Sequence, residues 1–417
     1  MVWHHEHMPR IFKVLLFLMV AGMAAQVLPF VIYHVPDAVT VATTAVPTGY
    51  PPDYKASDMA RANAFNQAIL FGAIARIATW FLAMFALLAS GIGSKFSGST
   101  IDSKRAWLTR SLFLVALYFC FRLVELPFVV CRFHHFQAFG LTPLSFYDWT
   151  EIMLIGLPVP LALFFLKYLL VVCSFPLFKK LWWIAACLCI FILYDVLPEI
   201  VSRTYPLDPV ETLSPLPQSP HADALKVVLE KAATRLPLMI VDQSNRAYSA
   251  NVYIAGRYGR QYVVITDTFL KTFTPDDAAL ALAHEIGHLR NEITMRLAGK
   301  ALTLLTLASG FFLAFLLTGR TALPISTALH TVMILMLCLT FASFLLQPLS
   351  NAFYRRQELN ADMEAIRLIP QPQAYSQLLV KMAKQNLEPL DMPKWEEYLF
   401  SSYPSIMTRI AITTPGR

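Results

Sequence analysis

The chain has 417 residues, of which 56% are hydrophobic and only 15% are charged, with a formal net charge of +7. A soluble domain usually has about a quarter of its residues charged, so this composition excludes an ordinary soluble enzyme and predicts an integral membrane protein in a lipid bilayer. The basic residues stand in short clusters at the ends of apolar runs, which is typical of membrane proteins and argues against nucleic acid as the partner.

Apolar runs long enough to cross a bilayer, which takes about 20 residues, recur along the chain. They predict roughly seven transmembrane helices, at residues 11–33, 67–91, 111–131, 152–173, 181–198, 301–318 and 328–347. The first run has the basic start and the AGMAA segment of a signal peptide. Its apolar part continues through VLPFVIY, so we interpret it as a membrane anchor.

The loop charges leave the orientation of these helices open. The positive-inside rule places the loops with Lys95, Lys104 and Lys179 in the cytoplasm, which would put the segment after the fifth span on the other side. Arg296 and Arg355, which flank the last two spans, favour the opposite orientation. A multi-pass protein of a bacterial cell membrane and one of an endoplasmic reticulum membrane both agree with the sequence.

Residues 199–300 interrupt the apolar pattern. The segment 221–236 has apolar residues at helical spacing, and three strand-like runs follow: LMIVDQS, NVYIAG and QYVVITDTFL, with RYGR as a hairpin turn. Thr274 and Pro275, followed by two aspartates, then predict the start of a helix. A second amphipathic helix, YRRQELNADMEAIRL, follows the last span.

These patterns divide the chain into four parts and predict a mainly α fold. They are a membrane domain with about five helices (1–198), the first part of a soluble α+β module (199–300), a transmembrane hairpin (301–347), and the second part of the module with the C-terminal tail (348–417).

The helix after Thr274 carries HEIGH at residues 284–288. His284 and His288 are four residues apart and therefore face the same way. Neutral imidazoles are good zinc ligands, and a catalytic zinc site keeps one position open for water. Glu285 can take a proton from that water, which is the logic of an HExxH metallopeptidase. The cofactor we expect is one Zn²⁺ per chain.

Two histidines and a water leave one ligand missing, and ELNADME offers it. Glu358 is a suitable third ligand. Asp362, four residues later on the same helical face, suits a supporting role in which it accepts the free ring N–H of a ligating histidine. An ordinary solvated helix face is the alternative, because acids are common on helices.

HEIGH, two membrane spans and then ExxxD at Glu358 and Asp362 resemble the type I CAAX prenyl proteases, which are integral-membrane gluzincin endopeptidases related to the HtpX heat-shock proteases. The resemblance is best over residues 198–410. It implies a zincin-like module with a large chamber inside a ring of membrane helices. It also implies a peptide or protein substrate, with prenylated C-terminal peptides as one class, and it leaves the oligomeric state open.

The resemblance further implies roles for three residues. Asn251 in YSANVYIAG matches the family's strand that lies beside the substrate backbone. Relatives have a His-Pro pair with an arginine six residues after the histidine; here YPSIMTR keeps Pro404 and Arg409 but has Tyr403 in place of the histidine. Tyr403 and Arg409 would then stabilise the oxyanion, since a tyrosine hydroxyl can donate a hydrogen bond.

Three rival functions remain at this point. Within the enzyme class, an HtpX-like protease of membrane-protein quality control is the alternative, although those relatives are shorter and have fewer spans. Outside it, a catalytically silent scaffold is suggested by Tyr403, and a transporter by charged residues in the spans. These charged residues are Arg76, Arg122, Glu125, Lys167 and Asp195.

Charges within spans usually pair or face a hydrated interior. Arg122 and Glu125, three residues apart, are expected to pair with each other. His134 and His135 are expected in an interfacial loop rather than in a second metal site. The six cysteines lie in or beside apolar runs and are expected to be small apolar core residues.

Overall fold

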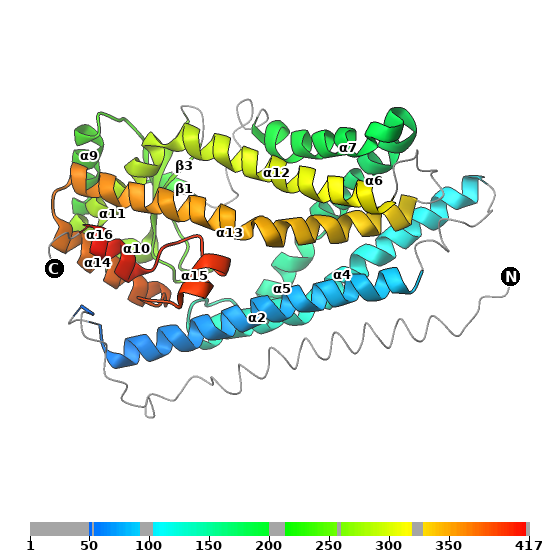
Figure 1. Ribbon diagram of the computed structural model, residues 1–417. Coiled ribbons are helices and arrows are strands. Elements are labelled where there is room, and N and C mark those ends of the chain that lie inside the picture. The colour runs from blue at the N-terminus through cyan, green and yellow to red at the C-terminus, as the bar shows by residue number, and fades with distance from the viewer. Residues whose placement is uncertain are drawn as a thin grey trace.

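The structure is a computed structural model. It describes residues 50–51, 54–91, 103–199, 213–256, 260–318 and 328–413. A small sheet and the helices packed on it gather at one end of the molecule, and long apolar helices extend from there to the other end (Figure 1). The expected first span, residues 11–33, lies outside the described residues.

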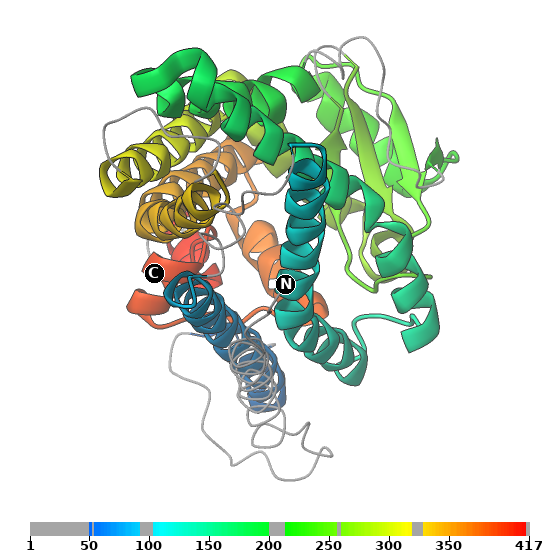
Figure 2. The ribbon, with the colours of Figure 1, turned by 90° about the vertical axis from the view of Figure 1, so that its right-hand side faces the viewer.

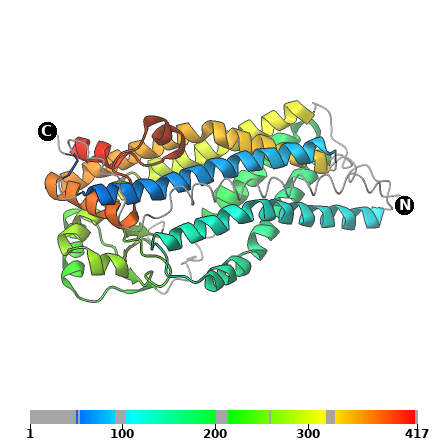
Figure 3. The same ribbon diagram turned by 90° about the horizontal axis from the view of Figure 1, so that it is seen from below.

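Six helices make up the membrane part. They are α2 (Ala56–Ala89), α4 (Ser103–Ala138), α6 (Pro158–Phe178), α7 (Trp182–Phe191), α12 (Glu292–Thr318) and α13 (Ala328–Leu368). Each helix contacts the next in a closed ring, in the order α2, α13, α12, α7, α6, α4 and back to α2 (Figure 2). Seen from below, α2 lies between α13 and α4 (Figure 3).

Five described segments are long and apolar enough to cross a membrane: 56–89, 111–138, 146–199, 292–318 and 329–368. The other six expected spans coincide with them, although the expected 67–91 ends two residues later and the expected 328–347 begins one residue earlier than the corresponding segment. Two of these, 152–173 and 181–198, share the segment 146–199, which contains α5 (Phe146–Ile155), α6 and α7, and which is divided at η1 (Lys179–Leu181). Large apolar side chains such as Leu82, Phe85 and Leu123 are exposed on the helices, as contact with lipid requires.

Two expectations for the membrane part can be compared with the structure directly. Arg122 and Glu125 pair as expected, with 3.2 Å between Nη1 and Oε2. The expected loop at His134 and His135 is wrong, because α4 continues as a helix to Ala138. His135 is buried there, and its Nε2 lies 3.1 Å from the carbonyl oxygen of Phe65, so the contact with α2 holds this last turn in place.

The sheet has four strands in the order β1-β2-β4-β3. The strands are β1 (Leu213–Pro215), β2 (Leu238–Val241), β3 (Val252–Ala255) and β4 (Tyr262–Thr266). β2 and β4 are parallel, whereas β1 and β3 run antiparallel to their neighbours. The third strand-like run ends earlier than its pattern predicts, because the side chain of Thr266 accepts from Phe269 N and starts α10 (Asp267–Thr272). β3 is an edge strand, with one side unpaired by any described strand.

Helices α9 (Pro220–Lys231), α11 (Pro275–Arg290), α14 (Pro372–Asn386) and α16 (Ile406–Thr413) pack with the sheet around one hydrophobic core. Val263, Ile265 and Leu282 are fully buried in it. α11 crosses this core and contacts β3 on one side and α13 on the other. The core therefore fixes α11, which carries HEIGH, between the edge strand and the long helix α13.

α13 is one helix of 41 residues. The sequence suggested a membrane span and then a separate amphipathic helix, but the helix continues through Pro348 and carries ELNADME on its last turns. At a rise of 1.5 Å per residue it is about 60 Å long. A single rigid element thus connects the membrane part to the site, and it packs closely against α12, where a Cβ on Gly310 would lie 2.9 Å from the Cα of Leu339.

Candidate active site

α11 begins with a well-formed cap. The side chain of Thr274 accepts from Asp277 N, the carboxylate of Asp277 accepts from Thr274 N, and Pro275 occupies the first turn, where no N–H is needed. The helix buries its apolar face in the core, and this leaves His284, Glu285 and His288 half-buried beside β3 and α13. The sequence features that predicted the helix are the ones that position these three side chains.

Gly287 brings α13 against α11. A Cβ on Gly287 would lie 2.7 Å from the Cα of Ala361 and 3.0 Å from its carbonyl oxygen, which is closer than real contacts allow. Only a glycine lets the two backbones approach this far. As a result, Glu358, one turn before Ala361 on α13, reaches the two histidines on α11.

The donor atoms of three side chains converge where the helices cross. The Nε2 atoms of His284 and His288 are 3.1 Å apart, and the carboxylate of Glu358 lies 3.4 Å from the first and 3.3 Å from the second. A tetrahedral ion held at 2.0–2.1 Å keeps its ligands about 3.3–3.4 Å apart. The two imidazoles and the carboxylate therefore fit a zinc ion and leave its fourth position open.

Glu285 is a second carboxylate near the histidines, within 4.8 Å of both. Its Oε2 accepts a hydrogen bond from Ile254 N of β3 at 3.3 Å, so it is held by the edge strand rather than by the two imidazoles. Burial raises the pKa of Glu285, against the opposing effect of the nearby histidines. This contrast favours Glu358 as the third ligand and leaves Glu285 to handle protons.

Asp362 is the centre of a buried polar network behind His284. Its Oδ1 lies 2.9 Å from His284 Nδ1 and accepts from the Tyr375 hydroxyl at 2.6 Å. Arg409 donates to both oxygens of the same carboxylate, from Nε at 2.8 Å and from Nη2 at 2.6 Å. With Nδ1–H directed to Asp362, the Nε2 lone pair of His284 is free for a metal.

The network also sets the charge at the site. Burial alone would lower the pKa of His284, but Asp362 and Glu358 raise it to about 9. The carboxylates that stabilise an imidazolium there would also stabilise a divalent cation. Burial raises the pKa of Tyr375, and Asp362 raises it further, so the hydroxyl stays protonated. Burial would lower the pKa of Arg409, but Asp362 raises it well above its usual value, so the guanidinium stays charged.

The donor atoms open into a cavity of about 820 Å³, which we call the active-site cavity. Asn251, just before β3, lines it. Tyr403 also lines it and is 58% exposed. Burial raises the pKa of Tyr403, as do the carboxylates of Glu358, Glu388 and Glu285, so its hydroxyl is a donor at neutral pH.

Arg409 has surroundings that differ from the expectation. The resemblance implies that it helps to stabilise an oxyanion. In the structure it borders the cavity, but its guanidinium is bound to Asp362, and Nη2 is 4.0 Å from Glu358 Oε2. Its direct contacts are therefore with the ligand-supporting network.

Sequence reasoning missed two residues of this site. Tyr375 on α14 touches Asp362 and lies 3.0 Å from His284 Nδ1, but no spacing rule connects a tyrosine in PQPQAY with HEIGH. Glu388 lines the cavity in the loop after α14, and burial raises its pKa. Its position after the αL residue Leu387, which ends α14, was the only local signal.

Comparisons with known proteins agree with this site. Residues 220–414 match the model of peptidase family M48. A relative, the uncharacterized metalloprotease YhfN of Bacillus subtilis (strain 168), is 25% identical over 357 residues, which cover 79% of this chain and 79% of the relative. The crystal structure of S. mikatae Ste24p has a TM-score of 0.67 and 16% identity, covering 97% of this chain and 99% of that chain.

The structural likeness shows a common fold. The family match covers the part of the chain that contains HEIGH, ELNADME and Arg409. Together with the metalloprotease relative and the match of residues 220–414 to peptidase family M48, these results show that the protein is a multi-pass membrane metalloprotease that acts on peptides or proteins.

Proposed function

We propose that the protein is a zinc endopeptidase of the CAAX-processing type, in which His284, His288 and Glu358 hold one Zn²⁺. The observation that carries this proposal is the convergence of two imidazoles and a carboxylate beside Glu285: the two Nε2 atoms are 3.1 Å apart, Glu358 Oε2 is 3.4 Å from His284 Nε2, and Glu358 Oε1 is 3.3 Å from His288 Nε2. When bound, the metal polarises the scissile carbonyl and makes a water molecule acidic near neutral pH.

The residues of the chain do the rest. The substrate adds an extended strand to the free edge of β3, next to Asn251, by β-augmentation. Glu285 accepts a proton from water and passes it to the leaving amine, a task suited to a carboxylate whose pKa is raised by burial. Tyr403 donates its hydroxyl to the developing oxyanion. Asp362 and Arg409 keep His284 in the tautomer that binds metal.

The domain division follows from the same proposal. Residues 199–300 supply the edge strand and HEIGH, and residues 348–417 supply Glu358, Asp362, Tyr403 and Arg409, so neither part alone has a complete site. The hairpin of 301–347 joins them through the membrane. The Bacillus relative favours a bacterial cell membrane over the endoplasmic reticulum.

Processing near the C-terminus is favoured over an HtpX-like role by the fold. The chain aligns with 99% of Ste24p, including the ring of membrane helices, and HtpX proteases are shorter with fewer spans. A transporter or a silent scaffold is disfavoured, because neither needs three donor atoms at metal-ligand separations beside a general base.

The test is a cleavage assay on purified protein in detergent micelles. Three substrates are compared: a farnesylated CAAX peptide, the same peptide without the lipid, and an unfolded membrane protein. Wild type should cleave the farnesylated peptide fastest, and Glu285→Gln should cut the rate by about 10²–10⁴-fold while it keeps its metal. Equal rates for wild type and Glu285→Gln would refute the enzyme proposal, and preference for the unfolded protein would favour the HtpX-like role.

A further inference from the structure

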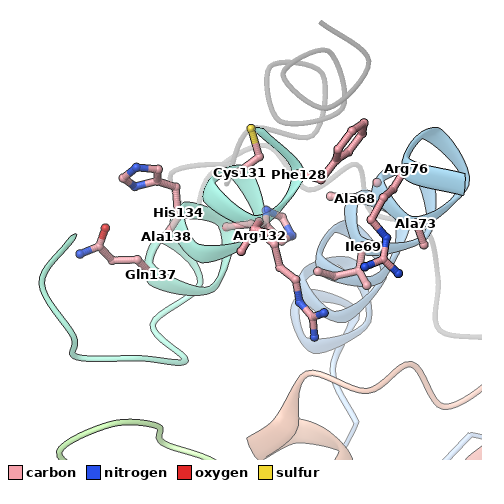
Figure 4. A pocket seen from close by; sticks show the side chains of 13 residues that line it. Ala68, Ile69, Ala73, Arg76, Phe128, Cys131, Arg132, His134, Gln137 and Ala138 are labelled. Carbon is pink, nitrogen blue, oxygen red and sulfur yellow. The ribbon is translucent and has the colours of Figure 1, made fainter. Parts of the chain in front are cut away.

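A second cavity, of about 660 Å³, lies between α2 and α4, and we call it the α2–α4 pocket. Small and apolar side chains such as Ile69, Ala73 and Phe128 form most of its wall, and two arginines, Arg76 of α2 and Arg132 of α4, also line it. In Figure 4 both arginines lie beside the space between the two ribbons, whereas His134 extends away from α2.

These two arginines have no carboxylate partner among the described residues. The acidic residues in the described parts of α2 and α4 are used elsewhere: Asp58 pairs with Lys384 at 3.3 Å, and Glu125 pairs with Arg122. Among the described residues, the Arg132 guanidinium contacts the ring of Phe136, with 5.3 Å between Cζ and the ring centroid. Unpaired charge within membrane helices is expensive and usually marks a ligand or ion site.

The pocket and the active-site cavity follow one another along one face of α2. Asn66 lines the cavity, and Ile69, Ala73 and Arg76 line the pocket. These four residues are spaced by three, four and three positions, which places them on one side of the helix. Arg76 is ten residues from Asn66, or about 15 Å along the axis, a distance that four or five residues of extended peptide cover.

The two arginines lie at different distances from the active-site cavity along α2 and α4. α2 and α4 run antiparallel, because Arg61 donates to the carbonyl of Phe139 while Phe65 lies beside His135. Arg132 is about one turn beyond His135, and Arg76 is about three turns beyond Phe65. Since arginine side chains are long and flexible, an anionic group that enters from the cavity meets Arg132 first and Arg76 further along.

The polarity of β3 decides which end of a substrate enters the pocket. The start of β3 is the end nearer α4, because Tyr248 N donates to the carbonyl of Leu141 just after α4, and the residues from Ser249 to Tyr253 line the cavity. A substrate strand antiparallel to β3, the more stable pairing, runs with its C-terminal end toward the start of β3. The segment after the scissile bond therefore heads for the α2–α4 pocket.

We propose that the α2–α4 pocket binds a carboxylate that the substrate carries on the C-terminal side of the scissile bond, and that Arg76 and Arg132 are specificity-determining residues. The proposal rests on the peptidase function proposed above. Arginine suits this role, because its guanidinium is always charged and binds carboxylates in a bidentate manner. The free C-terminal carboxylate of a short leaving segment is the ligand we expect.

Matched peptides test the proposal. One peptide sequence is made with a free C-terminal carboxylate, as its C-terminal amide, and as the amide with an added aspartate on the C-terminal side. Wild type should have a KM about tenfold lower for the acid than for the amide, with a similar kcat. A factor of about ten is the gain in affinity expected from one charge-assisted hydrogen bond. The aspartate peptide distinguishes a requirement for the chain terminus from a requirement for any carboxylate.

The variants identify the residues. Arg76→Gln with Arg132→Gln should raise the KM of the acid to that of the amide and leave the amide unchanged. Arg122→Gln, which removes an arginine of α4 that already has a partner, is the matched control and should keep the preference. A metal content and a melting temperature equal to those of wild type would show that the double variant is folded. If the variant does not fold, the KM values of wild type for the acid and the amide still test whether a carboxylate is recognised.

Failure of this proposal can be told from failure of the proposed function. If wild type cleaves the acid and the amide with equal KM, the pocket proposal is wrong and the peptidase remains. If wild type cleaves neither, the function is wrong, and binding of fluorescent acid and amide to Glu285→Gln still tests the pocket. Equal binding of both peptides, together with retention of phosphatidylglycerol that depends on Arg76 and Arg132, would assign the pocket to a lipid and overturn the proposal.

Discussion

The helix pair α11 and α13 and the helix pair α2 and α4 differ in how they pack and in how they neutralise charge. At the first crossing the backbones touch at Gly287 and Ala361, and Glu358, Asp362 and Arg409 each face a group of opposite charge or a histidine. At the second pair the helices leave a pocket of about 660 Å³ with two arginines and no carboxylate. Tight, fully paired contacts suit a site that must hold one ion in place, whereas an open and unpaired pocket suits a ligand that enters and leaves.

The largest effect should come from opening the tight crossing. Gly287→Val should abolish metal binding and activity, because its Cβ would lie 2.7 Å from Ala361 Cα and the helices would have to separate. Overpacking should also lower the free energy of unfolding by about 1–3 kcal/mol. Metal analysis and melting temperature are the measurements.

Gly299→Ala is the control for Gly287, since a Cβ there meets only the Tyr354 hydroxyl, at 3.5 Å. Full metal content and activity in Gly287→Val would show that the close approach of α11 and α13 is not needed for the site.

A smaller effect is expected in the cavity between the two helix pairs. Tyr403→Phe removes one hydroxyl and should lower kcat by about 10²–10³-fold with the metal retained, as the loss of one oxyanion donor does. Tyr398→Phe, which changes an exposed tyrosine of α15 (Lys394–Phe400), is the control. A kcat within twofold of wild type would exclude Tyr403 from the chemistry and leave the oxyanion to other groups.

The smallest effect concerns the loop that joins the module to the end of α4. Asp267 accepts from Gln243 N and Ser244 N at 3.0 Å each and from Lys271 Nζ at 2.6 Å. Burial would raise the pKa of Asp267, but these donors, led by Lys271, hold it well below its usual value. Asp267→Asn should therefore cost roughly 1.5–3 kcal/mol of stability at pH 7.

The depressed pKa of Asp267 also determines how its contribution to stability changes with pH. Because the pKa is depressed in the folded state, the stabilisation is complete above the unfolded pKa of about 3.9 and is lost as the pH falls through lower values. The melting temperatures of wild type and Asp267→Asn should differ at pH 7 and converge in acid. Asp223→Asn, at an exposed ion pair, should show little difference at either pH, and a gap for Asp267→Asn that persists in acid would contradict this account.

The comparison of the two helix pairs also shows what the sequence could predict. HEIGH and ELNADME predicted the residues whose donor atoms converge, because a spacing of four residues on a helix is a local property. The cap at Thr274 predicted the start of α11. Apolar runs gave the spans, because length and hydropathy decide membrane insertion. The sequence also predicted the pair of Arg122 and Glu125, three residues apart on one helix.

What the sequence could not predict depends on contacts between distant segments. Tyr375 reaches Asp362 only because α14 packs against α11, which in turn lies against α13. Gly287 in HEIGH gave no hint that Ala361 lies against it. The helical conformation at His134 and His135 depends on a contact of His135 with Phe65, 70 residues earlier in the chain. The α2–α4 pocket arises from the register of two antiparallel helices, and no property of either helix alone encodes that register.

The central claim is that His284, His288 and Glu358 hold one divalent ion, and metal analysis tests it directly. Purified wild type should contain one equivalent of zinc per chain, and Glu358→Ala should lose it under mild chelation. Glu364→Gln, which changes another acid of α13 that pairs with Arg290, should keep the full equivalent. One tightly held zinc in Glu358→Ala, with the affinity of wild type, would contradict the account.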